Sequence, residues 1–186
     1  METKTRKRRH LVHGAAIVAA MLVTALAPAQ SLHFGPHDVT SLFSISKSEN
    51  KNEVVFALHL DEHCAPAGNN PVFAFWRMNE KGPNFIEPLL DREQRAYGIA
   101  SQRVITTGAD GGSVDLTLRA MPDRHIVVRS QRQGAGCVAW SSLPIAGASA
   151  NLYNIYVKLK LLGVDFILLS GWTADRSRVV TERVER

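Results

Sequence analysis

The alternation of apolar and polar residues in short segments, separated by turn residues, constrains the fold of this chain more than any other feature. In residues 113–121, for example, Val114, Leu116 and Leu118 alternate with polar side chains. This period of two is typical of a half-buried strand, because successive side chains of a strand point to opposite faces. Turn residues recur about every ten residues, which is typical of an antiparallel sandwich or barrel.

We predict an all-β domain with about eight or nine strands and one short helix. The helix is predicted over residues 87–98, where Pro88 stands in the first turn and Gly98 just past the last. Strands and helices do not alternate along the chain, which argues against a parallel sheet built from βαβ units. The segments with strand character are 41–46, 52–61, 72–79, 99–107, 113–121, 125–131, 137–144, 151–162, 164–172 and 177–185.

Residues 1–29 differ from the rest of the chain and are predicted to be a secretory signal peptide. Five Lys or Arg residues precede an apolar run over 11–27, and small residues at 27–29 offer a cleavage site before Gln30. The alternative is a retained anchor, but the run is shorter than the ~20 residues that a spanning helix needs. We therefore expect residues 30–186 to form one exported domain, in the periplasm or outside a bacterial cell, with membrane contact only through the signal segment.

The predicted domain is nearly neutral, although the whole chain is basic. The full sequence has a formal charge of +5, of which residues 1–29 contribute +4 through five Lys or Arg and one Glu, so that +1 remains. Nucleic-acid-binding domains usually carry a strongly basic surface. We therefore expect no nucleic-acid partner.

The predicted domain contains two cysteines, Cys64 and Cys137. Disulfides form in oxidising compartments such as the bacterial periplasm. Two thiols in one exported domain therefore predict a disulfide between Cys64 and Cys137, provided that the fold brings them together.

The stretch HLDEHC raises the question of a metal site, because His59, Asp61 and His63 would project from the same side of an extended strand. Residues two apart on a strand lie ~6–7 Å from each other, which is long for chelating one ion. The order also differs from the HExxH zinc motif. We therefore favour a strand with a solvated face that runs into a loop, and we predict no cofactor. The alternative is a metal-dependent or other envelope hydrolase that uses this face.

The three tryptophans, Trp76, Trp140 and Trp172, are candidate ligand-binding residues. Aromatic side chains in a β domain can line a cavity for an apolar ligand, although more of them simply form the core. Our leading hypothesis is a non-enzymatic exported domain that binds a small apolar ligand or an envelope partner. A further alternative is a structural or interaction module with no ligand.

Three stretches together resemble an uncharacterised bacterial family of exported proteins, a domain of unknown function. They are FSISKSENKNEVVFAL (43–58), PVFAFWRMNEKG (71–82) and PLLDREQRAYGI (88–99). The shared patterns are S-K-x-x-N-K-N-E-V-V, P-V-x-x-x-W and A-Y-G-I, and the resemblance extends from about Leu42 to near Val184. The resemblance implies a β-rich domain behind a signal peptide, and it brings no catalytic residues to this chain.

Overall fold

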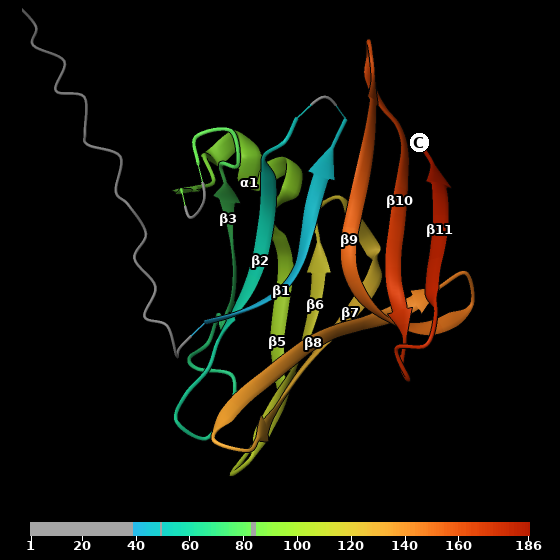
Figure 1. The fold of residues 1–186 in the computed structure, drawn as a ribbon. Coiled ribbons are helices and arrows are strands. Elements are labelled where there is room, and N and C mark those ends of the chain that lie inside the picture. Colours follow the sequence, from blue (N-terminus) through green and yellow to red (C-terminus); the bar gives the residue numbers. More distant parts are fainter. Residues whose placement is uncertain (1–38, 49, 83–84) are drawn as a thin grey trace, which may run out of the picture.

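The computed structural model describes residues 39–48, 50–82 and 85–186, and within them the chain forms eleven strands and one helix (Figure 1). The predicted signal peptide lies outside the described residues. The prediction of an all-β domain with one short helix is confirmed. The elements are β1 (Val39–Lys47), β2 (Glu53–His59), β3 (Val72–Arg77), β4 (Ile86–Pro88), α1 (Asp91–Tyr97), β5 (Ile99–Gly108), β6 (Gly111–Leu118), β7 (Met121–Gln133), β8 (Gly136–Ile145), β9 (Ala148–Lys160), β10 (Gly163–Thr173) and β11 (Val179–Glu185).

The long strand β9 connects the two halves of the sheet. Its residues 148–152 pair antiparallel with β8, whereas residues 154–157, further along the same strand, pair in parallel with β1. Strand β10 pairs antiparallel with β9, and β11 pairs with β10. The strand order is therefore β4-β3-β2-β1-β9-β8-β7-β6-β5, with β10 attached to β9 and β11 attached to β10. Figure 1 shows β5, β6 and β7 lying behind the layer that contains β1 and β2.

One large hydrophobic core lies between these strands. It contains side chains from β1 and β2 together with side chains from β6, β7, β9 and β10. Phe43 of β1 and Phe56 of β2 stack with their ring centroids 4.6 Å apart. Val114, Leu116 and Leu118 all belong to this core and are fully buried, as their alternation with polar residues in the sequence predicts.

The strand count and two details of pairing differ from the sequence prediction. The described residues form eleven strands instead of about eight or nine, and the β1–β9 pair is parallel. The predicted helix 87–98 begins only at Asp91, because residues 86–88 pair with β3 as a short edge strand. Pro88 is tolerated at such an edge, where its missing N–H removes no bond between central strands. A three-residue strand is too short to show a period, and local alternation carries no information on the pairing partner.

The described strands form one large mixed sheet that is not closed into a barrel. The side chain of Gln102 nevertheless connects β5, at one end of the strand order, to β3, the strand next to the other end. Its amide nitrogen donates to the carbonyl oxygen of Val72, and its amide oxygen accepts from the N–H of Val72, both at 2.9 Å. One side-chain amide thus supplies the two hydrogen bonds that a neighbouring strand would give β3 at this point.

Glu182 on β11 joins three separate parts of the sheet. Its carboxylate accepts hydrogen bonds from the guanidinium of Arg124 on β7 and from the N–H of Ala146 in the β8–β9 turn, the latter at 2.7 Å. The hydrogen bond from Arg124 is the main reason why the pKa of Glu182 lies below its usual value, and the Ala146 N–H adds to the effect.

We expect Glu182→Gln to destabilise the protein by about 1 kcal/mol at neutral pH, because the ion pair is only partly buried. A carboxylate whose pKa is lowered by folding stabilises the protein above its unfolded-state pKa, and this contribution disappears as the pH falls through the folded-state pKa. Urea unfolding of the wild type and Glu182→Gln should therefore converge at acidic pH. Glu185→Gln, which removes a more exposed carboxylate, is the control. A constant difference across the pH range would contradict this role.

Candidate functional site

An apolar cavity of about 430 Å³ opens between β9, β10 and the helix α1. Its floor is formed by core residues of β1, β9 and β10, and its rim by α1 and by the turn between β6 and β7. All lining side chains except that of Arg186 are apolar or aromatic. They are Ile45, Ala96, Tyr97, Ala120, Met121, Ile155, Val157, Leu159, Val164, Ile167 and Arg186. A concave site of this size with few polar groups is suited to a small apolar ligand.

Arg186 provides the charged group at this cavity. Its guanidinium donates a hydrogen bond of 2.8 Å to the carbonyl oxygen of Ala120. This contact holds one N–H group and leaves other donors of the planar guanidinium for a further acceptor. The arrangement can therefore bind a molecule that combines an apolar body with an acidic head.

Helix α1 is held beside the cavity by a network around Trp76. The indole N–H of Trp76 on β3 donates to Oε2 of Glu93 at 2.9 Å, and the same oxygen accepts the N–H of Leu90 at the start of the helix. The rings of Trp76 and Tyr97 meet edge to face, with 6.2 Å between their centroids, and Nζ of Lys47 lies 5.3 Å from the Trp76 ring.

Tyr97 is a wall of the apolar cavity, and its hydroxyl is in an environment that favours the neutral form. Burial, and then the nearby charge of Glu93, raise the pKa of Tyr97 above its usual value. The phenol therefore remains a neutral hydrogen-bond donor at physiological pH.

The structure separates the three candidate tryptophans. Trp76 is buried and lines a depression of about 400 Å³ beside α1, together with polar residues that include Lys47 and Glu87. Trp140 and Trp172 instead share a groove of about 450 Å³ on β8, β9 and β10. The interpretation of all three as ligand-binding residues stays a prediction, and it now concerns two different places.

The groove that contains Trp140 and Trp172 is open and mixed in character. Trp172 is 41% exposed and Tyr153 is 40% exposed, and their ring centroids lie 6.1 Å apart. Asn151 and Arg176 add polar groups to the same groove. A neighbouring depression also includes Trp140 and continues the groove with further polar side chains, among them Arg129, Gln131, Gln133, Ser142 and Ser149.

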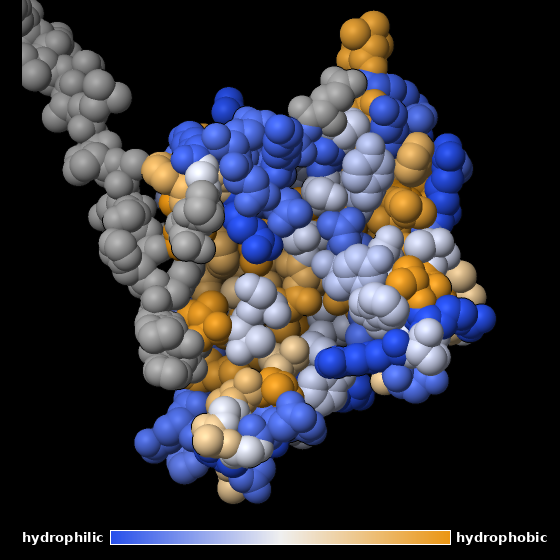
Figure 2. All heavy atoms as spheres, in the orientation of Figure 1, coloured by the Kyte–Doolittle hydropathy of each residue, from blue (hydrophilic) through white to orange (hydrophobic). Residues whose placement is uncertain are grey.

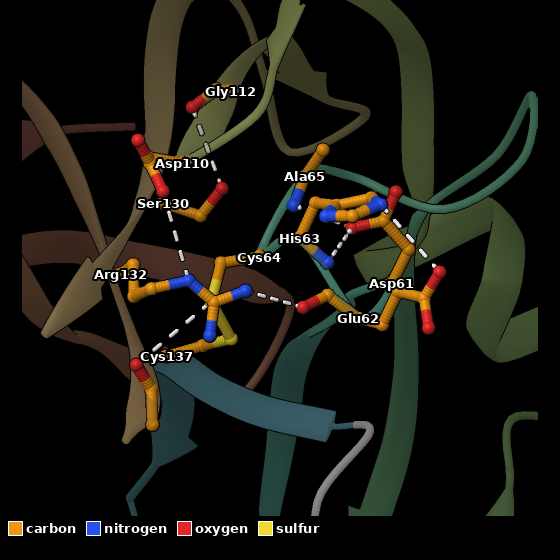
Figure 3. The surroundings of a disulfide bond; sticks show 11 residues. Asp61, Glu62, His63, Cys64, Ala65, Asp110, Gly112, Ser130, Arg132 and Cys137 are labelled. Carbon is orange, nitrogen blue, oxygen red and sulfur yellow. Dashed lines mark hydrogen bonds and ion pairs between the residues drawn. A yellow bond between two sulfur atoms is a disulfide. The ribbon is translucent and has the colours of Figure 1, made fainter. Parts of the chain in front are cut away.

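Cys64 and Cys137 form a disulfide bond, with 5.4 Å between their Cα atoms (Figure 3). The bond connects the loop after β2 to the start of β8. Asp61 shapes this loop, because its Oδ1 atom accepts the N–H groups of His63 and Ala65 at 2.9 and 2.8 Å. The predicted disulfide is therefore present, and it agrees with export to an oxidising compartment.

The metal candidates His59, Asp61 and His63 have different surroundings. The ring of His59 lies against that of Phe73, with 4.5 Å between centroids, while His63 is exposed near Glu62. Within the described part of the chain, no group of three or more His, Cys, Asp or Glu side chains is placed to hold a metal ion. The Asp61 carboxylate instead accepts hydrogen bonds from the backbone N–H groups of its own loop.

The face of β2 that carries His59 is less polar than the sequence suggested. Val55 and Ala57 are 2% and 0% exposed, and together with Phe75 of β3 they form a second, smaller hydrophobic cluster. The expectation of a solvated face on this strand is therefore wrong for Val55 and Ala57. The sequence contains a signal for this burial, because both faces of the strand are apolar up to His59, and Val55 and Ala57 lie on the face of His59.

The tip of the β9–β10 hairpin also differs from the sequence prediction. The strand pattern of residues 151–162 predicts that Leu161 and Leu162 continue the strand, but the structure places them in the turn between β9 and β10. Gly163, which follows them, has a φ of +112°, a conformation that favours glycine. This glycine was the available signal for the turn.

Comparison with known proteins identifies a family but no activity. No curated protein and no solved structure is similar enough to this chain to count as a match. No helix among the described residues is long and apolar enough to cross a membrane. Residues 43–183 match the model of a family described as Domain of unknown function (DUF4833). This match confirms the expected resemblance and covers most of the chain, so the protein belongs to the DUF4833 family.

Proposed function

We propose that this protein is a non-enzymatic exported domain that binds a small amphiphile in the apolar cavity between α1, β9 and β10. The observation that carries the proposal is the lining of this cavity, whose side chains are all apolar or aromatic apart from Arg186. Burial of an acyl or other hydrocarbon chain in such a cavity is favourable because it removes apolar surface from water. The signal peptide predicted for residues 1–29 and the disulfide support a place in the periplasm or outside the cell.

The ligand is expected to carry an acidic head. Arg186 is the charged side chain of the cavity, and guanidinium groups bind carboxylates and phosphates through paired hydrogen bonds. The chain would extend inward over Ile155, Val157 and Ile167, all of which are nearly fully buried. A fatty acid or a similar single-chain amphiphile matches both ends of this site.

A fluorescent fatty acid, undecanoic acid carrying a dansyl group, is a suitable probe for titration. Ala120→Phe should weaken its binding about tenfold or more, because the new ring occupies the rim of the cavity. Ala139→Phe makes the same change in the groove of Trp140 and Trp172, and should leave binding of the probe unchanged. Equal affinities for wild type and Ala120→Phe would contradict the proposal, provided that both proteins unfold at similar temperatures.

The groove of Trp140, Tyr153 and Trp172 favours a second candidate function, the binding of an envelope saccharide. Exposed aromatic rings offer flat apolar surfaces to sugar rings, while Asn151 and Arg176 can bind hydroxyl or acidic groups. The same two variants distinguish the candidates. Saccharide binding, followed by tryptophan fluorescence, should be lost in Ala139→Phe and kept in Ala120→Phe.

A further inference from the structure

The turn between β9 and β10 places two leucines in water at the outermost end of the hairpin. Leu161 is 98% exposed and Leu162 is 88% exposed, whereas the next most exposed large hydrophobic side chain of the described residues, that of Leu90, is 55% exposed. Figure 2 shows this hydrophobic tip projecting beyond the body of the molecule, with hydrophilic side chains directly below it.

The turn itself does not require leucine at these positions. Turn positions favour Gly, Asn, Asp and Ser, whose side chains suit the backbone geometry or bond to it. The left-handed residue of this hairpin is Gly163, so its backbone requirement is met without the leucines. The turn geometry therefore does not explain the two leucines. Because they are almost fully exposed, they offer apolar surface to a binding partner of the domain.

The charges near the tip indicate what that surface meets. Lys158 and Lys160 lie on the β9 arm of the hairpin, and neither takes part in an ion pair among the described residues. The nearby acidic residues are Asp165 on β10 and Glu185 on β11, and the second of these pairs with Arg183. Two apolar residues at the tip, with two lysines next to them, match an anionic bilayer, in which the hydrocarbon lies behind the phosphate groups.

The tip and the apolar cavity also share the same end of the molecule. Leu159 and Val164 are paired across the hairpin just behind the tip, and both line the cavity. A bilayer that receives the tip would therefore lie close to the cavity.

We propose that Leu161 and Leu162 insert into the interfacial region of a lipid bilayer with anionic headgroups, while Lys158 and Lys160 contact its phosphates. This membrane contact is additional to the one expected from the signal segment. It goes beyond the proposed ligand binding, because the tip projects outside the cavity and can be tested without a ligand in it.

The test is sedimentation of the exported protein with vesicles of phosphatidylcholine that contain about one-third phosphatidylglycerol. The double variant Leu161→Asp/Leu162→Asp should bind about tenfold or more weakly, since the apolar contact is replaced by two repelled charges. Lys158→Gln/Lys160→Gln should weaken binding to these vesicles and not to phosphatidylcholine alone. Ile105→Asp changes another half-exposed hydrophobic residue, on β5, and should bind as the wild type does.

A second measurement, the fluorescence of a single introduced tryptophan, tests the proposal without placing charges in the turn. Leu162→Trp should show a blue shift of its fluorescence on addition of anionic vesicles, and Ile105→Trp should not. Equal vesicle binding by wild type and Leu161→Asp/Leu162→Asp would overturn the proposal. It would also be overturned if the wild type ignored vesicles but formed a dimer that the same substitutions dissociate, because the tip would then be a contact between two copies of the chain. Loss of vesicle binding with intact binding of the dansyl probe would separate this inference from the proposed function.

Discussion

Replacing both Cys64 and Cys137 with serine is expected to lower the free energy of unfolding by about 4 kcal/mol. The two cysteines are 73 residues apart in the sequence, so their bond closes a long loop in the unfolded chain. A cross-link of this kind destabilises the unfolded state by restricting its conformations, and the effect grows with the length of the loop. For a domain of this size the expected loss is a large fraction of the total stability.

Hydrogen bonds also hold the loop that contains Cys64 in its conformation. Asp61 binds two backbone N–H groups within the loop, and the guanidinium of Arg132 on β7 donates to the carbonyl oxygen of Glu62 (Figure 3). Neither contact involves a sulfur atom, so we expect both to remain in the serine variant. We therefore expect the variant to keep the native fold and to differ mainly through its unfolded state.

Urea unfolding at neutral pH, with and without a reducing agent, checks this prediction. The reduced wild type and the double serine variant should have nearly the same free energy of unfolding, and reduction should not affect the variant. The slope of the free energy against urea should rise without the cross-link, because a freer unfolded chain exposes more surface. A loss below about 1 kcal/mol would mean that loop closure contributes little here.

Most strands of this fold could be predicted from the sequence, but their arrangement could not. Alternation at Val114, Leu116 and Leu118 depends only on one buried face, and it is correct in the structure. The parallel pairing of β1 with β9 depends on residues more than a hundred positions apart, such as Ile45 and Ile155. No local pattern encodes such a pairing, so the branching of the sheet at β9 appears only in the structure.

The candidate site was predictable only in part, for the same reason. The disulfide followed from the number of cysteines and the predicted compartment. The apolar cavity did not, because its lining comes from strands, a helix and a turn that are distant in the sequence. The ligand-binding role of Trp76 stays a prediction, and the structure adds that its indole N–H donates a hydrogen bond to Glu93 of α1. A side chain that suits a ligand also suits the core, and only its neighbours distinguish the two.

Phe56→Ala is expected to destabilise the protein by about 3–5 kcal/mol, which makes it the second large effect. Phe56 is completely buried in the middle of β2, and its ring stacks on that of Phe43 in β1. Truncation removes the transfer free energy of the ring, and it also leaves a cavity that the paired strands β1 and β3 on either side cannot easily collapse into. The stacked pair adds a further contribution that alanine cannot replace.

Phe85→Ala is the matched control, because it removes the same ring from a side chain that is 45% exposed. It should cost less than about 1 kcal/mol, since surface substitutions rarely cost more. Phe56→Leu should fall between the two, because leucine refills part of the volume. Urea unfolding of all three variants gives the comparison. If Phe56→Ala cost no more than Phe85→Ala, the hydrophobic core around Phe56 would be loosely packed. The cavity between α1, β9 and β10 would then be one more packing defect and not a binding site. A large loss at Phe56 beside a stable, fatty-acid-binding wild type would instead show that the domain is close-packed except where a ligand enters.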